Sequence, residues 1–189
     1  MTEITTIGYE HENLYDKAHI LAKQLNFALD KHARSCLFVG ADKLALKIPG
    51  FLPISAELSR TFWFKRKSEG KKQGLVRACK PCTGLKILDA TAGWGRDAAI
   101  LASFGAEVLM IERHPVMAAL LSDALLRRDA FEQQQMLLSL YTGNAYSYLK
   151  VLDEINYPDV IYIDPMHPER NKSALVKKEM QVLQQRSEE

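Results

Sequence analysis

Polar residues end four apolar runs in the C-terminal part of the chain, and their types suit ligand binding and catalysis. The first run ends at Asp89 and a glycine-rich turn, the second at Glu112, the third at Thr142-Gly143-Asn144 and the fourth at Asp164. If the runs are parallel strands, their carboxyl ends meet at one edge of a sheet, where α/β folds bind their ligands. The four positions therefore predict a binding site at that edge.

The turn DATAGWGRD contains Gly93 and Gly95, which allow a ligand to approach the main chain closely because glycine has no Cβ. A dinucleotide site would require the spacing G-x-G-x-x-G. Ala98 occupies the third glycine position here. A nicotinamide-dependent oxidoreductase is therefore a poorer fit than an enzyme with another nucleoside-like cofactor.

The charges around this turn favour S-adenosylmethionine as that cofactor. Asp97 places a negative charge at the start of the next helix, where a dinucleotide would place its pyrophosphate. Asp97 is suited to the ammonium group of S-adenosylmethionine and Arg96 to its carboxylate, although Asp97 would also complement the helix dipole. Glu112, at the end of the second strand, is positioned to accept both ribose hydroxyls, as it would for either cofactor.

The segment IYIDPMHP suggests which group is methylated. An exocyclic amine must be held through its N–H groups, and the Asp164 carboxylate with the Pro165 carbonyl offers two acceptors. His167 is a flat side chain able to stack on a base that has left its helix. Alignment supplies much of the rate in such a reaction, so little acid–base catalysis is needed. The alternative is a polar strand end followed by a proline turn.

A basic stretch at residues 60–80 predicts contact with nucleic acid, because clustered cations neutralise phosphates. The aromatic triplet at 62–64 precedes its densest part and is suited to base stacking. The alternative is a solvated linker with one buried aromatic cluster. The candidate phosphate contacts are Arg60, Lys65, Arg66, Lys67, Lys71 and Lys72 here, and Lys172, Lys177 and Lys178 near the C-terminus.

The order of elements predicts a small α/β unit over 1–59, a basic and aromatic connecting segment over 60–84, and a Rossmann-like domain over 85–189. The first unit is expected to hold a helix at 14–31 and strands at 35–40 and 43–48. The second alternates strands at 85–90, 107–113, 136–144 and 159–165 with helices at 95–105, 115–134, 145–155 and 173–185. Such βα repeats predict a doubly wound parallel sheet.

Composition narrows the class of protein further. The 189 residues are 47% hydrophobic and carry a net charge of +2, without a signal-peptide pattern or a run long enough to span a membrane. Cys79 and Cys82 form a C-K-P-C motif but lack the second ligand pair of a structural zinc site, and Cys36 adds no obvious fourth ligand. We therefore expect a cytoplasmic protein without a metal ion.

The motifs DATAGWGRD, IERHPVM, IDPMHP and KSALVKKEM together resemble those of the ribosomal RNA small subunit methyltransferase J family. The resemblance runs from about residue 65 to 184, and more loosely through the N-terminal unit. It implies a class I S-adenosylmethionine-dependent methyltransferase fold, and methylation of the N2 amine of a guanine in 16S ribosomal RNA or the small subunit. The oligomeric state stays open.

The resemblance also implies cofactor contacts, which extend the candidate set at the strand ends. This set comprises Asp89, Gly93, Gly95, Arg96, Asp97, Glu112, Arg113, Asn144, Ala145 and Asp164. Two departures from the family stand out. His167 replaces the phenylalanine of the family's DPMFP motif, and further C-terminal strands of the family sheet are expected to be missing.

Two competing functions remain open at this point. A DNA or small-molecule amino-methyltransferase shares the same site, although the basic stretch argues against a small substrate. A non-catalytic RNA-binding or ribosome assembly factor with a degenerate methyltransferase fold is the alternative from a different class, because of His167 and the missing strands.

Overall fold

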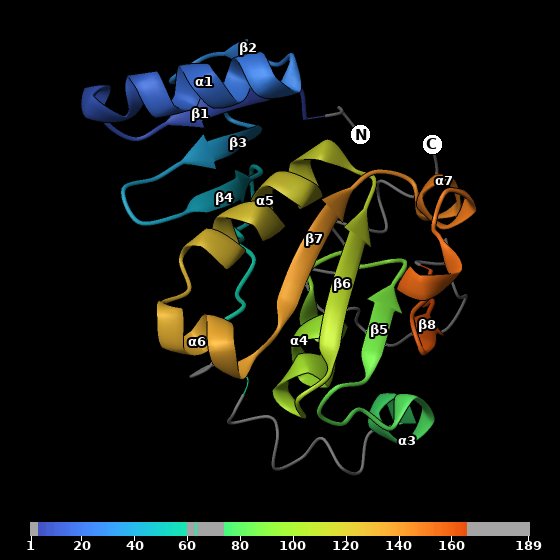
Figure 1. The fold of residues 1–189 in the computed structure, drawn as a ribbon. Helices are drawn as coiled ribbons and strands as arrows, with labels where there is room; N and C mark the ends of the chain where they lie inside the picture. The colour runs from blue at the N-terminus through green and yellow to red at the C-terminus, as the bar shows by residue number, and fades with distance from the viewer. Residues whose placement is uncertain (1–3, 60–62, 64–73, 166–189) are drawn as a thin grey trace, which may run out of the picture. The chain divides into compact units, whose positions relative to one another are not determined.

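The computed structural model describes residues 4–59, 63 and 74–165, and Figure 1 shows the order of their elements. These residues group into two compact units. The first contains residues 4–55 with Asp164 and Pro165, and the second contains Ala56–Ile163. Among the described residues, no helix combines the length and apolar character needed to cross a bilayer.

The first unit is a four-stranded sheet with one α-helix packed on it, preceded by a short 3-10 helix at Glu12–Leu14. The strand order is β2-β1-β3-β4, in which β3 and β4 pair antiparallel and the other pairs are parallel. The core contains Ile7, Leu37 and Leu46 from the strands. The elements are β1 (Thr6–Tyr9), α1 (Tyr15–Leu25), β2 (Ala28–Leu29), β3 (Cys36–Val39) and β4 (Leu44–Lys47).

The single helix expected over 14–31 is wrong at its C-terminal end. Asn26 adopts the left-handed conformation, with φ of 57°, and its N–H donates to carbonyls of the last turn of α1. Asparagine tolerates this conformation, which ends a helix. The Ala28 N–H then donates to the Thr5 carbonyl at 2.8 Å, so the chain continues as β2. β1 is a further difference, because no strand was predicted before residue 35.

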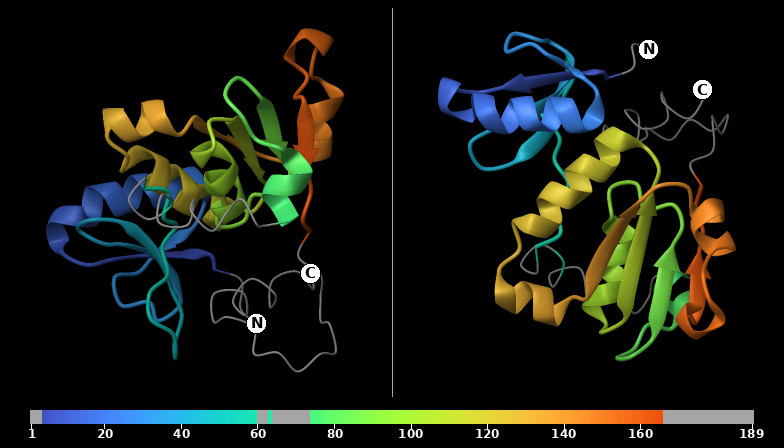
Figure 2. Two further views of the ribbon diagram at one scale, coloured as in Figure 1. Left: turned by 90° about the horizontal axis from the view of Figure 1, so that it is seen from below. Right: turned by 45° about the horizontal axis from the view of Figure 1, so that its top comes forward.

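The second unit contains the doubly wound parallel sheet that the sequence predicts, in the order β7-β6-β5-β8. Figure 1 shows this sheet with α4 behind it, and Figure 2 gives two further views. The elements are α3 (Gly74–Cys79), β5 (Lys86–Asp89), α4 (Arg96–Ser103), β6 (Glu107–Glu112), α5 (Pro115–Leu126), α6 (Ala130–Gln135), β7 (Leu138–Thr142), α7 (Ala145–Lys150) and β8 (Val160–Tyr162).

The helix expected over 115–134 is in fact two helices, α5 and α6. Asp129 is the N-cap of α6: its carboxylate accepts the Glu132 N–H at 2.7 Å, and Glu132 accepts the Asp129 N–H in return. This reciprocal capping box starts a new helix. The buried Arg128 guanidinium donates to the carbonyls of Glu132 and Met136, which satisfies the end of α6.

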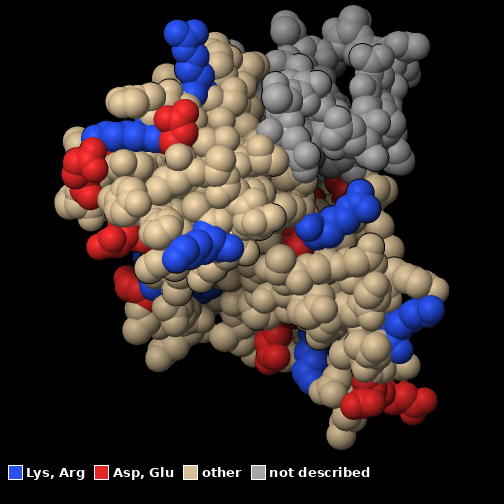
Figure 3. Space-filling model, turned by 90° about the horizontal axis from the view of Figure 1, so that it is seen from above, with Lys and Arg blue, Asp and Glu red and all other residues tan. Residues whose placement is uncertain are grey.

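The basic and aromatic segment is described only in part. Trp63 is 1% exposed, and its indole N–H donates to the Glu57 carbonyl at 2.7 Å. The expectation that the aromatic triplet stacks on bases is therefore wrong for Trp63, which belongs to the core. The expected phosphate contacts of this segment and of the C-terminal segment, with His167, lie outside the described residues. In the view of Figure 3, described basic and acidic side chains are interspersed.

Candidate cofactor site

The strand order places the candidate site beside β5. The chain proceeds from β5 outward to β6 and β7, and then returns to place β8 on the other side of β5. The carboxyl ends of β5 and β8 therefore flank the point where the order reverses, and open α/β sheets bind ligands in the crevice at such a point. Asp89, buried at 1% exposure, ends β5 there, and Tyr162 ends β8.

The glycine-rich loop between β5 and α4 is held by hydrogen bonds from its own backbone. The acceptors come from the loop itself and from the ends of β5, β6 and β8, which are the strands around the crevice. The bonds run from the N–H of Ala90 to Tyr162 O (2.9 Å), Thr91 to Asp89 Oδ1 (3.1 Å), Ala92 to Ile111 O (3.2 Å), Gly93 to Glu112 Oε2 (2.9 Å) and Gly95 to Ala92 O (2.7 Å). The loop conformation is therefore built by the protein alone.

Glu112 is partly buried and uses both carboxylate oxygens within the fold. Oε2 accepts the Gly93 N–H, and Oε1 accepts the His114 N–H at 2.7 Å. Burial raises the pKa of the Glu112 carboxyl, and the N–H groups of His114, Gly93 and Arg113 oppose that rise. A carboxylate has about four lone-pair positions, so Glu112 retains capacity to accept ribose hydroxyls beside these bonds.

The two loop glycines have different structural roles. Both have positive φ, 52° at Gly93 and 70° at Gly95. A Cβ at Gly95 would lie 2.8 Å from Leu121 Cδ2 and 3.2 Å from Met110 Sδ, so this glycine is required by packing against α5 and β6. A Cβ at Gly93 would meet nothing closer than 3.9 Å, which leaves the open space beside the loop that a ligand needs.

Asp97 is the second residue of α4 and is hydrogen-bonded to the last residue of β8. The Tyr162 hydroxyl donates to Asp97 Oδ2 at 2.7 Å, across 65 positions of sequence. Arg96 and Asp97 are both partly buried at the helix start. Tyr162 was not among the predicted site residues, although the sequence places this tyrosine two residues before Asp164 in an otherwise apolar strand.

The remaining candidates lie at the ends of β6, β7 and β8. Arg113 is exposed after β6. Asn144 follows β7 and is the N-cap of α7, where its Oδ1 accepts the Ser147 N–H at 3.1 Å, and Ala145 is the first residue of the helix. Ile163 leads from β8 to Asp164 and Pro165, which are exposed and end the described part of the chain.

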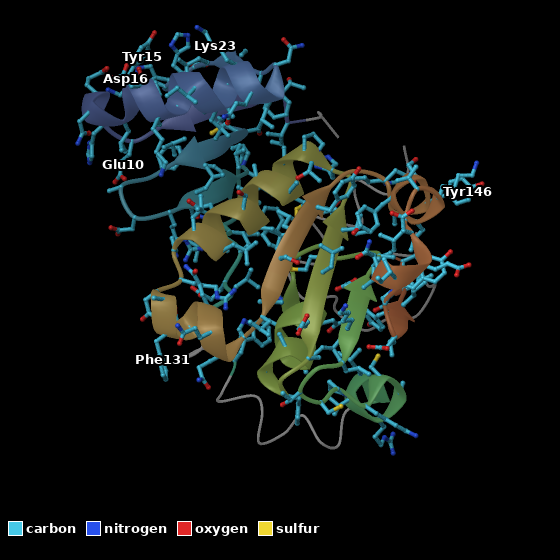
Figure 4. The ribbon with its side chains drawn as sticks, in the orientation of Figure 1. Glu10, Tyr15, Asp16, Lys23, Phe131 and Tyr146 are labelled. Carbon is cyan, nitrogen blue, oxygen red and sulfur yellow. The ribbon has the colours of Figure 1, made fainter. Side chains whose placement is uncertain are left out.

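Three further features of this unit are not among the predicted site residues. Trp94, between the loop glycines, is 6% exposed, and its indole N–H has no hydrogen-bond partner among the described residues. A cavity of about 1000 Å³ is lined by residues of β5–β7 and α5–α7 and by none of the glycine loop. It is therefore separate from the candidate site. Figure 4 shows Tyr146, 68% exposed, extending outward from α7.

The residues at the carboxyl edge fit S-adenosylmethionine better than a dinucleotide. Ala98, at the position of a third glycine, is fully buried in α4, and the Asp97 carboxylate lies at the helix start. The negative charge of Asp97 opposes a pyrophosphate there. Glu112 and Asp97 instead offer carboxylates to ribose hydroxyls and to an ammonium group. Among the described His, Cys, Asp and Glu residues, no group of three or more could hold a metal ion.

Comparisons with known proteins agree with this fit. Residues 20–186 match a family model described as "Putative SAM-dependent methyltransferase". A crystal structure of a SAM-dependent methyltransferase from Neisseria gonorrhoeae aligns with a TM-score of 0.63 and 25% identity, over 87% of this chain and 71% of that one. The fold is thus that of an S-adenosylmethionine-dependent methyltransferase, and S-adenosylmethionine is its cofactor.

Curated relatives define the family more narrowly. The chain is 64% identical over 185 residues to "Ribosomal RNA small subunit methyltransferase J" of Legionella pneumophila strain Corby, covering 98% of this chain and 76% of that protein. It is 40% identical to the protein of that name from Thioalkalivibrio sulfidiphilus, over 94% of this chain and 74% of that protein. The chain belongs to the ribosomal RNA small subunit methyltransferase J family.

Proposed function

We propose that this chain transfers a methyl group from S-adenosylmethionine to the exocyclic N2 amine of a guanine in 16S ribosomal RNA. Ribosomal RNA as the substrate is supported by the names of its curated relatives. The choice of an amine as the methylated group rests on the position of two residues in the chain. Asp164 and Pro165 follow, after one residue, the strand that pairs with β5, and the loop after β5 holds the cofactor candidates.

The cofactor half of the site is assigned to the loop and the ends of β5 to β8. Glu112 binds the ribose, and Asp97 and Arg96 bind the ammonium and carboxylate of the methionine portion. Asp89, Gly93, Gly95, Arg113, Asn144 and Ala145 complete this proposed set. When bound, S-adenosylmethionine supplies an electrophilic methyl group on a sulfonium.

The substrate half is assigned to Asp164, Pro165 and His167. The Asp164 carboxylate and the Pro165 carbonyl each accept an N–H of the guanine amine, which orients the nitrogen for attack. Asp164 then passes to water the proton that the nitrogen loses when it bonds to the methyl carbon, while the bond from that carbon to sulfur breaks and leaves S-adenosylhomocysteine. His167 stacks on the extruded base in place of the family's phenylalanine. Alignment of this kind supplies most of the acceleration.

The phosphate contacts are assigned to two sets of basic residues, which hold the RNA around the extruded base. Clustered lysines and arginines bind a nucleic-acid backbone in a salt-dependent way. We therefore expect the affinity for RNA to fall steeply with salt, while the affinity for cofactor does not. The two sets are Arg60, Lys65, Arg66, Lys67, Lys71 and Lys72, and Lys172, Lys177 and Lys178.

The test is methyl transfer from labelled S-adenosylmethionine to small ribosomal subunits that lack the modification, and to naked 16S ribosomal RNA. Nucleoside analysis of the digested RNA identifies the product, which we expect to be N2-methylguanosine. Asp164→Asn replaces an acceptor with an amide and should lower kcat by about 100-fold or more. Asp153→Asn, at an exposed position outside the site, is the matched control.

Two other outcomes of this experiment would contradict the proposed function. Methylation of another atom or of DNA would refute the assigned substrate. S-adenosylhomocysteine binding and RNA binding without transfer, unchanged by Asp164→Asn, would favour a non-catalytic assembly factor instead.

A further inference from the structure

Tyr162 forms hydrogen bonds to both ends of the glycine-rich loop. Its backbone carbonyl accepts the N–H of Ala90, at the start of the loop, at 2.9 Å. Its hydroxyl donates to Asp97 Oδ2, where α4 begins, at 2.7 Å. One residue of β8 therefore fixes the loop at its entrance and at its exit, although it lies 65 positions beyond Asp97.

The hydroxyl bond determines how the Asp97 carboxylate is presented. A hydrogen bond to a charged acceptor is stronger than one between neutral groups, and it restricts the carboxylate to one orientation. It occupies Oδ2, and within the described part of the chain Oδ1 accepts no hydrogen bond. Asp97 thus keeps one oxygen for a cationic partner while the other is held by the protein.

Tyr162 also lies two residues before Asp164 in the chain. The same side chain that orients a proposed cofactor contact therefore belongs to the strand that leads to the proposed substrate contact. Because β8 pairs with β5 in parallel register, with Tyr162 opposite Asp89, a shift of β8 would move both contacts together.

From this geometry, we propose that Tyr162 is a positioning residue for methyl transfer, which orients the Asp97 carboxylate toward the ammonium group of S-adenosylmethionine and couples it to the strand leading to Asp164. The inference rests on the proposed function for its substrate half. Its cofactor half is independent of RNA and is tested without it.

Tyr162→Phe removes the hydroxyl and retains the ring and the backbone bond to Ala90. We expect the Kd for S-adenosylhomocysteine, measured by calorimetry, to rise about 10- to 100-fold, the value of a hydrogen bond to a charged group. The KM for S-adenosylmethionine should rise with it. Tyr157→Phe, at an exposed tyrosine of the same unit, is the matched control and should bind as the unmodified chain does.

A double-mutant cycle separates positioning from a merely structural role. If Tyr162 acts through Asp97, the loss of affinity caused by Tyr162→Phe should disappear in an Asp97→Asn background. An equal loss in both backgrounds, or unchanged binding by Tyr162→Phe in the Asp97 background, would overturn the proposal. A further outcome is that the variants change cofactor affinity as predicted but the unmodified chain transfers no methyl group to ribosomal RNA. This result would refute the proposed function and would leave the role of Tyr162 in cofactor binding intact.

Discussion

The Glu112 carboxylate accepts the Gly93 backbone N–H at 2.9 Å, and so joins the end of β6 to the glycine-rich loop that follows β5. The same side chain is our candidate for binding the ribose. On this proposal, a single carboxylate both shapes the loop and contacts the ligand, and the two roles are separable by substitution.

Glu112→Gln retains one acceptor oxygen but places an amide beside a backbone N–H. We expect it to weaken binding of S-adenosylhomocysteine by about 10-fold or more, because a charged acceptor of the ribose hydroxyls is lost. Glu112→Ala should abolish detectable binding, since the loop also loses its support. Isothermal calorimetry with S-adenosylhomocysteine, and with NADH as the control ligand, measures both. Tight binding of NADH instead would contradict the assigned cofactor.

The raised pKa of Glu112 predicts how stability depends on pH. The native state holds the proton to a higher pH than the unfolded chain, whose carboxyl titrates near its ordinary value of 4.5. Stability falls with rising pH wherever the native state binds more protons. The contribution of Glu112 to the free energy of unfolding should therefore decrease above pH 4.5 and level off beyond the native pKa.

Urea unfolding of the unmodified chain and of Glu112→Gln at a series of pH values isolates this contribution, because the other groups titrate alike in both. The difference should shift in favour of Glu112→Gln as pH rises. A difference that is constant with pH would contradict the expected direction of the pKa shift.

Gly95→Ala should destabilise the second unit by about 2–5 kcal/mol, because it adds a Cβ both to a left-handed backbone and to a packed contact with Leu121. Gly84→Ala is the matched control, since Gly84 has φ of 83° and nothing within 4 Å of the added Cβ. It should cost about 1–2 kcal/mol from the backbone alone. If urea unfolding shows that Gly95→Ala and Gly84→Ala lower the free energy of unfolding equally, the contact with Leu121 adds nothing to the cost at Gly95.

Asn144→Ala should lower the free energy of unfolding by about 1 kcal/mol, because Asn144 caps α7 through the Ser147 N–H. Asn144→Ser supplies another capping oxygen and should restore most of that stability. Both variants are compared with the unmodified chain by urea unfolding. Failure of serine to restore stability would mean that the amide has a further partner.

Much of the second unit could be predicted from sequence, because each strand of its sheet lies in a largely apolar run that is followed by polar residues. The positions of Asp89, Glu112 and Asp164 followed from that pattern and from the parallel order. The break between α5 and α6 was readable in the Asp129-x-x-Glu132 spacing, but the apolar periodicity of the surrounding residues suggested one continuous helix.

Other features depend on contacts between residues far apart in the sequence, which no local pattern contains. The bond from Tyr162 to Asp97 and the one from Glu112 to Gly93 are of this kind. Trp63 is a case in which the local sequence pattern suggested the wrong environment. Its position beside a run of lysines suggested a surface role, and only the bond to Glu57 and its burial identify it as a core residue.

The bonded amides of the glycine-rich loop have an electrostatic consequence. Free backbone N–H groups attract anions, but in this loop the N–H groups of Ala90, Thr91, Ala92, Gly93 and Gly95 are already used within the fold. The candidate charged side chains of the second unit at this rim are Asp89, Asp97 and Glu112, beside Arg96 and Arg113. Three carboxylates against two guanidinium groups leave a small negative balance, which favours the approach of a sulfonium over that of a phosphate.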